Sequence, residues 1–304
     1  MIDRIEYINQ LRDNTTFIIS GHNIKWVAVL AVESLIKRCG IKRENIVYFD
    51  DYSTDGTSEE LNKRGIRIIS WIPSIFRNFS RSSLKSDLCV RVDQIIRCAA
   101  KQEYDTKYIC FLDGDMVYEQ DAIGYYFNFF YDEYIKAEKT PDFVGILRVG
   151  RNPQRATEET ITNITQNFLW CDIALANENE LFENRLDELI IAQEKDPTGF
   201  AENYDTGGLV SKAIRMCTLN YICLENEQAE DMYTGLLARA YHFNWMASSM
   251  RKDDLFEGDW KEKYDTTIIN MKNVLPPFCE EYGIPLDTII AHYTNCIKQS
   301  PVCE

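Results

Sequence analysis

The chain has 304 residues, of which 45% are hydrophobic and 27% are charged, a balance typical of a globular protein with a substantial core. Its 48 acidic and 33 basic residues give a formal net charge of −15. This charge argues against a nucleic-acid surface, which needs clustered Lys and Arg, so we expect no nucleic-acid partner. No apolar run approaches the roughly 18 residues of a membrane span, so we also expect no transmembrane segment.

Cysteine usage and the polar start of the chain bear on its compartment. The chain has ten cysteines but no Cys-x-x-Cys pair, so we expect reduced thiols that behave as small hydrophobic groups. Residues 1–14 are polar and do not form a signal sequence. Together these features predict a cytoplasmic location, with peripheral association at the cytoplasmic face of a membrane as the alternative.

Apolar runs that predict strands alternate with helical patterns along the first third of the chain. Helices are expected at residues 24–38, 58–64 and 84–100, and strands at 17–20, 46–50, 67–70 and 108–112. This alternation predicts an α/β fold with a mostly parallel central sheet. Without repeats or low-complexity segments, we expect a single domain over 1–304, with a nucleotide-binding half at 1–120 and an acceptor-binding half at 121–304.

The second half is harder to assign from its pattern. A further strand is expected at 142–149. Residues 158–195 are helical in composition and carry no strand signal, which predicts a helical insertion bordering an acceptor site. A turn leading into a strand is expected at 204–210, and the tail from residue 280 is expected to wrap back across the active site.

Two carboxylates follow the apolar strand at 108–112, in the sequence Asp113-Gly114-Asp115. Buried strands do not normally end in paired acids. In extended chain the two acids point to the same side, which suits two oxygen ligands of one hard divalent cation. The alternative is an ordinary surface turn, since short acidic turns are common.

A second acidic segment follows the strand at 46–50, where Asp50 and Asp51 precede Ser53-Thr54-Asp55-Gly56-Thr57. One interpretation is an ordinary turn into a helix, with Asp55 or Thr57 as its N-cap. That does not explain the first two acids. Carboxylates at the end of a parallel strand lie where open α/β sheets bind ligands, and they can accept hydrogen bonds from a ribose or a base.

These two segments resemble the nucleotide-sugar glycosyltransferases of the GT-A fold. Residues 47–57 resemble the family 2 nucleotide-binding segment, V-D-D-x-S-x-D-x-T, and residues 111–115 resemble the D-x-D metal motif. The resemblance implies a Rossmann-like three-layer sandwich and a Mn²⁺ or Mg²⁺ cofactor held by Asp113, Asp115 and His292. The donor-binding residues that it implies are Ser20, Gly21, Asp50, Asp51, Asp87, Arg91, Asp113, Gly114 and Lys298.

Three later segments extend the resemblance. Residues 203–210 resemble the acceptor loop, which implies acceptor contacts from Asp205, Gly207 and Gly208. Glu230-Asp231 resembles the pair that carries the general base in inverting members, although acids also favour helix N-termini. The segment 292–298 resembles the H-x-x-G-x-x-K tail of several retaining families, with Asn295 in place of Gly. There the His binds the metal and the Lys binds the diphosphate. The alternative for His292 is an ordinary core or surface histidine.

The expected activity is metal-dependent transfer of a sugar from a nucleotide diphosphate, with UDP-sugar favoured, to a hydroxyl of a glycan or another acceptor. We expect an inverting reaction, with Asp231 as the preferred general base and Glu230 as the second choice. A retaining reaction is the alternative. Two other classes remain: a sugar-phosphate nucleotidyltransferase, against which the absence of a Gly-rich loop after the first strand argues, and a non-catalytic glycan-binding protein. His22 is expected to border the base pocket and His242 to lie in a packed strand.

Overall fold

The fold is seen in a computed structural model, which describes residues 2–51, 53–70, 95–148, 163–195, 208–217, 219–224, 240–243 and 260–299. The chain divides into two compact units that interleave along the sequence. Unit 1 holds Met1–Ile18, Pro73–Leu112 and Gly124–Ala229, and unit 2 holds Ile19–Ile72, Asp113–Ile123 and Glu230–Glu304. Seven strands belong to one mixed, mostly parallel sheet, so the predicted α/β class is confirmed.

Unit 1 carries the mixed part of the sheet. Here β4 (Tyr108–Asp113) pairs with β7 (Asn163–Asp172), which runs antiparallel to it and to β6 (Phe143–Arg148). The next strand, β8 (Tyr221–Leu224), is parallel to β6, so the order is β4-β7-β6-β8. Where β4 begins, the Tyr108 amide donates to the carbonyl oxygen of Asn14 at 2.9 Å, next to the start of β1 (Thr15–Gly21).

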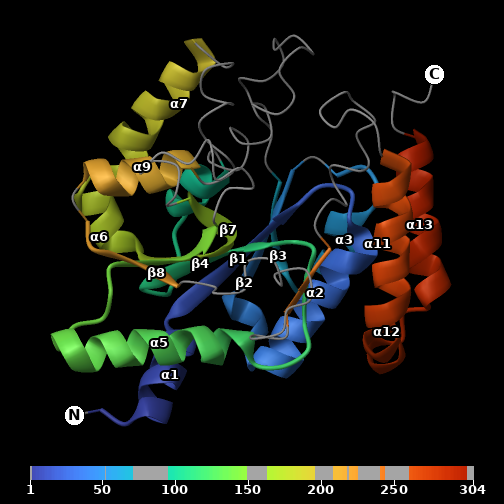
Figure 1. The fold of residues 1–304 in the computed structure, drawn as a ribbon, viewed down its shortest axis with the longest axis horizontal. Coiled ribbons are helices and arrows are strands. Elements are labelled where there is room, and N and C mark those ends of the chain that lie inside the picture. Colours follow the sequence, from blue (N-terminus) through green and yellow to red (C-terminus); the bar gives the residue numbers. More distant parts are fainter. Residues whose placement is uncertain are drawn as a thin grey trace. The chain divides into compact units, whose positions relative to one another are not determined.

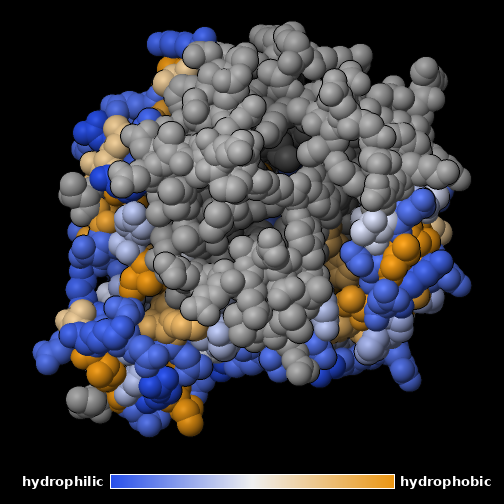
Figure 2. Space-filling model, in the orientation of Figure 1, coloured by the Kyte–Doolittle hydropathy of each residue, from blue (hydrophilic) through white to orange (hydrophobic). Residues whose placement is uncertain are grey.

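Unit 1 has an aromatic core. Its described helices include α1 (Arg4–Asp13), α5 (Ala122–Ala137), α6 (Ile173–Glu178), a π-helical turn (Leu181–Arg185), α7 (Leu186–Lys195) and α9 (Gly208–Met216), and residues 95–100 are also helical. Trp170 is fully buried, with its ring centroid 4.9 Å from that of Phe130, and its indole nitrogen donates to Thr15 Oγ1 at 3.1 Å. Hydrophobic and hydrophilic residues both reach the surface around α1 and α5 (Figure 2), as an amphipathic α5 predicts.

Unit 2 carries the parallel part of the sheet and most of the acidic strand ends. Its strands β2 (Ile46–Asp50) and β3 (Arg67–Ser70) are parallel, and β5 (Met116–Tyr118) pairs antiparallel with β9 (Ala240–His242). Its helices are α2 (Lys25–Cys39), α3 (Thr57–Lys63), α11 (Trp260–Val274), α12 (Pro276–Tyr282) and α13 (Leu286–Gln299), with a short 3-10 turn at Arg43–Asn45. Both α12 and α13 pack against α2 (Figure 1).

Two predictions about the second half are wrong. The segment 158–195 is not wholly helical, because it contains the ten-residue strand β7. Residues 168–171 of that strand are all buried, and its pairing on both sides outweighs the polar residues that made its first half look helical or irregular. The strand expected at 204–210 is also wrong, since Leu209 and Val210 lie in the first turn of α9.

Other expectations are confirmed or lie partly outside the described residues. The strands at 17–20, 46–50, 67–70, 108–112 and 142–149 are confirmed within a residue or two, as are the helices at 24–38 and 58–64. His242 lies in a strand as expected. Of the helix expected at 84–100, residues 95–100 are helical and the remainder lies outside the described part. The tail is helical through α13, and whether it crosses an active site stays a prediction, as does the single domain.

Two further observations concern the compartment predictions. Within the described ranges, no helix is both long enough and apolar enough to cross a bilayer. The cysteines whose side chains are described carry thiols rather than disulfides. Burial raises the pKa of the Cys110 and Cys171 thiols well above the ordinary value, so neither is a reactive thiolate at neutral pH.

Candidate functional site

Three strand ends of unit 2 converge at one place, and two glycines allow it. A Cβ added to Gly114 would lie 2.4 Å from the carbonyl oxygen of Ser20, so the turn after β4 packs directly on the end of β1. A Cβ on Gly21 would lie 2.7 Å from the Tyr48 hydroxyl oxygen. The Asp51 amide donates to the carbonyl oxygen of Gly21 at 3.1 Å. The ends of β1, β2 and β4 therefore lie side by side, as expected for the ligand-binding edge of an α/β sheet.

The acids predicted to bind the donor and the metal occupy these strand ends. Asp50 and Asp113 are the last residues of β2 and β4, and Asp51 follows directly; all three are buried. The Asp50 carboxylate accepts a hydrogen bond from the Ser53 amide at 3.2 Å, which forms the turn out of β2. Asp115 is half-buried, and its carbonyl oxygen accepts from the Phe243 amide at 3.0 Å, next to β9.

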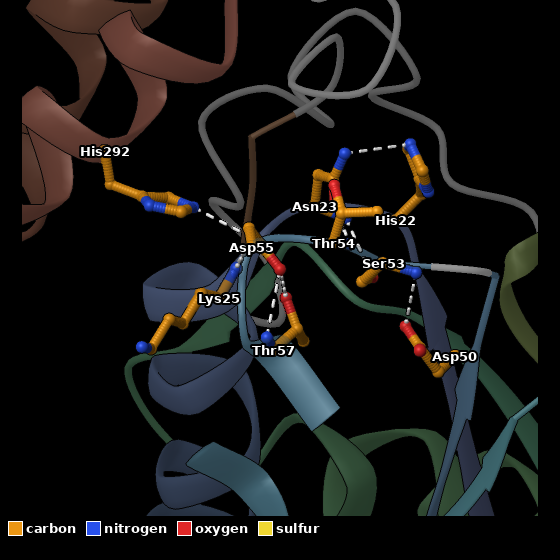
Figure 3. A network of polar contacts seen from close by, with 9 residues as sticks. All are labelled: His22, Asn23, Lys25, Asp50, Ser53, Thr54, Asp55, Thr57 and His292. Atoms are coloured by element: carbon orange, nitrogen blue, oxygen red, sulfur yellow. Dashed lines mark hydrogen bonds and ion pairs between the residues drawn. The ribbon is translucent and has the colours of Figure 1, made fainter. Parts of the chain in front are cut away.

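Asp55 is the centre of the polar network drawn in Figure 3. One carboxylate oxygen accepts from the Thr57 amide at 2.9 Å and from its hydroxyl at 2.5 Å, at the start of α3. The other accepts from the Lys25 amide at 3.1 Å, at the start of α2, and lies 2.9 Å from His292 Nε2 on α13. A single carboxylate therefore bonds the first residues of two helices and joins a third helix to them. The N-cap position of α3 is Gly56, so the expectation of Asp55 or Thr57 as the N-cap is wrong, although Asp55 accepts from the amide of the first helical residue.

The protonation of Asp55 follows from these contacts. Burial acts to raise the pKa of its carboxyl group, but the hydrogen bonds from His292, from Thr57 and from the Lys25 amide outweigh it and lower the pKa to about 2. Asp55 is therefore ionised at neutral pH. The negative charge at the N-termini of α2 and α3 is favourable, because it opposes the positive ends of both helix dipoles.

His292, a predicted metal ligand, contacts Asp55 through Nε2. Within the described ranges, no group of three or more His, Cys, Asp and Glu side chains is arranged to hold a metal ion. Lys298 lies six residues further along α13, and its side chain is outside the described part. Metal binding by His292 and diphosphate binding by Lys298 stay predictions.

The other predicted site residues are distributed as follows. Ser20 and Gly21 end β1, and Gly114 forms the turn after β4, so these three join the acids in unit 2. Gly208 is the first residue of α9, in unit 1. The residues outside the described part of the chain are Asp87, Arg91, Asp205, Gly207, Glu230 and Asp231.

Sequence reasoning missed two residues of this network. Asn23 adopts a left-handed conformation with φ 53° and bonds the loop after β2, whereas the sequence analysis gave it no role. Asp55 was considered only as a cap for α3, and its links to α2 and α13 were not foreseen. The spacing Asp-x-Thr predicts the bond between Asp55 and Thr57 at the start of α3. Nothing in the local sequence predicts the contacts of Asp55 with Lys25 and His292, which lie 30 and 237 positions away.

Comparison with known proteins gives distant structural similarity only. No protein-family model and no curated protein matches the chain. It is similar to the mannosyltransferase PcManGT from Pyrobaculum calidifontis in complex with GDP-Man and Mn²⁺ (11% identity, 96% of this chain and 76% of that chain, TM-score 0.39). It is also similar to mouse xyloside xylosyltransferase 1 (12%, 76% and 97%, TM-score 0.43) and to a cytidylyltransferase from Leptospira borgpetersenii (13%, 71% and 78%, TM-score 0.37). Because these TM-scores are below 0.5, the similarity does not distinguish a glycosyltransferase from a nucleotidyltransferase.

Proposed function

We propose that this chain is a metal-dependent glycosyltransferase of the GT-A type, which moves a sugar from a nucleotide diphosphate, with UDP favoured, to an acceptor hydroxyl. The observation that carries the proposal is the packing of the Asp113-Gly114-Asp115 turn on the end of β1, beside the Asp50-Asp51 strand end. A nucleoside site and a metal site on the ends of β2 and β4, the two strands that flank β1, are what a nucleotide-sugar donor requires, because its diphosphate links the two.

The residues present fit a divalent cation that is completed by its substrate. Asp113 and Asp115 offer two carboxylates in one turn, and Mg²⁺ in particular is commonly held by one or two carboxylates together with substrate phosphates and water. When bound, Mn²⁺ or Mg²⁺ would neutralise the charge that develops on the leaving diphosphate. His292 is the third proposed ligand, a role in which it would exchange or share its contact with Asp55.

The remaining roles are assigned by residue type. Asp50 and Asp51 would bind the nucleoside, whose hydroxyl or base N–H groups can donate to carboxylates. Asp231, with Glu230 as the second choice, would accept the proton of the acceptor hydroxyl in an inverting displacement. Lys298, Asp87 and Arg91 would contact the donor. Acceptor contacts would come from Asp205, Gly207 and Gly208.

The test is a donor-hydrolysis screen with Mn²⁺ and a panel of UDP- and GDP-sugars, read as release of the nucleotide. We expect release from one donor, lost in Asp115→Asn and kept in Asp105→Asn, which changes an exposed acid in the turn before β4. Asp231→Asn should abolish transfer to an added acceptor, and the anomer formed distinguishes inversion from retention.

Other outcomes would contradict the proposal. Release of pyrophosphate from a nucleoside triphosphate and a sugar phosphate, with no reaction of nucleotide sugars, would indicate a nucleotidyltransferase. If metal and nucleotide together give no thermal stabilisation, the chain does not bind nucleotide. A non-catalytic glycan-binding protein would then be the remaining alternative.

A further inference from the structure

Two adjacent residues, His22 and Asn23, join the loop after β1 to the loop after β2 in unit 2. His22 Nδ1 lies 2.6 Å from the carbonyl oxygen of Asp51, and His22 Nε2 lies 3.0 Å from Asn23 Nδ2. The Thr54 amide donates to Asn23 Oδ1 at 2.8 Å. Figure 3 shows the His22 and Asn23 side chains facing each other above the β2 loop.

The partners determine where the protons of this group lie. The Thr54 amide can only donate, so the atom of Asn23 that faces it is the oxygen, and the amide NH₂ faces His22. That NH₂ donates, so His22 Nε2 must accept and carries no proton. The carbonyl oxygen of Asp51 can only accept, so His22 Nδ1 carries the proton. His22 is therefore held as the neutral Nδ1–H tautomer, with both ring nitrogens engaged by the loops.

The backbone of Asn23 makes the same connection a second time. Its amide donates to Ser53 Oγ at 3.0 Å, and its φ of 53° turns the chain from β1 into α2. Asn is among the few residues other than Gly that adopt this left-handed conformation at modest cost. Asn23 thus meets three requirements at one position: the backbone turn, the acceptor for Thr54 and the donor for His22.

We propose that Asn23 is a positioning residue for the nucleoside: it fixes the tautomer and orientation of His22 and thereby holds Asp51, Ser53 and Thr54 in the positions that bind the base and ribose. This inference rests on the proposed function, because it concerns the same Asp50-Asp51 site. It also excludes His22 as a general base or metal ligand in this conformation, since neither role is open to a ring whose nitrogens are both bonded within the loops.

The expected consequence is on binding rather than on the chemical step. A loop that is already ordered does not lose conformational freedom when the ligand binds, so removal of the Asn23 side chain should raise the Kd for UDP and the KM for the donor. We expect an increase of about tenfold in both, which corresponds to ordering one or two side chains, with kcat within about twofold of wild type.

The first measurement is the tautomer of His22 in the 304-residue chain, by ¹⁵N–¹H correlation of the imidazole rings, with the resonance assigned by its loss in His22→Asn. We expect the Nδ1–H pattern. In Asn23→Asp the residue can no longer donate to Nε2, and we expect the Nδ1–H pattern to be lost. An Nε2–H pattern in the wild type would overturn the inference.

The second measurement is UDP binding by calorimetry with Mg²⁺, alongside donor hydrolysis. Asn23→Gly removes the side chain but suits the left-handed backbone, so it should fold. Glu138→Gly is the matched control, because Glu138 has φ 52° at the end of α5 and is exposed. We expect weaker UDP binding only in Asn23→Gly. Equal affinity in the wild type and Asn23→Gly would overturn the inference and leave the proposed function intact, whereas no binding by either would overturn the proposed function itself.

Discussion

In unit 1 the central strand β7 is buried against aromatic rings, whereas in unit 2 the strand β2 ends in a network of carboxylates, hydroxyls and amides. Trp170 on β7 contacts Phe130 and Tyr108, with ring centroids 4.9 and 4.5 Å apart, and makes one side-chain hydrogen bond. Asp55, after β2, receives four interactions within 3.1 Å. The stability of the β7 region depends mainly on buried apolar area, which is not directional. The network after β2 depends on hydrogen bonds, which weaken when their distances or angles change.

This difference means that the two regions should respond differently to mutation. Loss of an aromatic ring should cost global stability and leave the chemistry of the strand ends unchanged. Loss of a polar partner in unit 2 should cost less stability but change ligand binding or pH dependence. Four substitutions test this, beginning with the largest expected effect.

Phe130→Ala should lower the free energy of unfolding by about 3–5 kcal/mol, because it empties a fully buried site beside Trp170 and Phe168. The measurement is urea denaturation followed by tryptophan fluorescence. Phe129→Ala, at the preceding position of α5 but 41% exposed, is the matched control and should cost less than about 1 kcal/mol. Equal losses for the two would contradict the aromatic core described for unit 1.

Gly114→Ala should cost about 1–3 kcal/mol and also weaken metal-dependent nucleotide binding, because its Cβ would meet the Ser20 carbonyl oxygen and displace the turn between the two acids. Urea denaturation and UDP titration measure the two effects. The control is Gly40→Ala, where φ is +65° but no atom lies within 4 Å, so it adds strain of about 1 kcal/mol without a clash. Unchanged UDP binding in Gly114→Ala would show that the turn does not hold the ligand.

Asp55→Asn should lower stability by about 2 kcal/mol at neutral pH and remove a pH dependence. The pKa of Asp55 is lowered from 3.8 to about 2 in the folded state, so its stabilisation is complete only above about pH 5 and is lost as the pH falls towards 2. The difference between wild type and variant, measured by urea denaturation between pH 6 and pH 2, should therefore close over that interval. A difference that stays constant with pH would contradict the assignment.

Asp132→Asn should change stability by less than about 0.5 kcal/mol, although Asp132 forms a 2.8 Å ion pair with Arg4. Both side chains are half-exposed, so solvent screens the pair and side-chain entropy opposes it. Thermal unfolding at low and high salt measures the effect. A loss of stability above about 1 kcal/mol would contradict this expectation and would mean that the Arg4–Asp132 ion pair stabilises unit 1 despite its exposure.

Much of the first half of the fold could be predicted from the chain, because its strands are short apolar runs that end at acids and its helices carry clear apolar periodicity. β2 and β4 end where their patterns change. β7 could not be predicted in this way, since its first half is mostly polar, with Asn163, Thr165, Gln166 and Asn167 in the same strand as Trp170. Only pairing with β4 and β6 makes that segment a strand.

For the candidate site, the sequence by itself determined which chemical groups are present: the acids at 50, 51, 113 and 115, an Asp-x-Thr at the start of a helix, and a small residue between the two acids of the turn. The tertiary structure decided which of them meet. It brought Gly114 onto Ser20, Asn23 onto Thr54 and His292 onto Asp55, contacts that span 31 to 237 residues. The physical reason is that a strand end or a cap is specified by neighbouring residues, whereas a hydrogen bond between distant loops depends on the packing of every element between them.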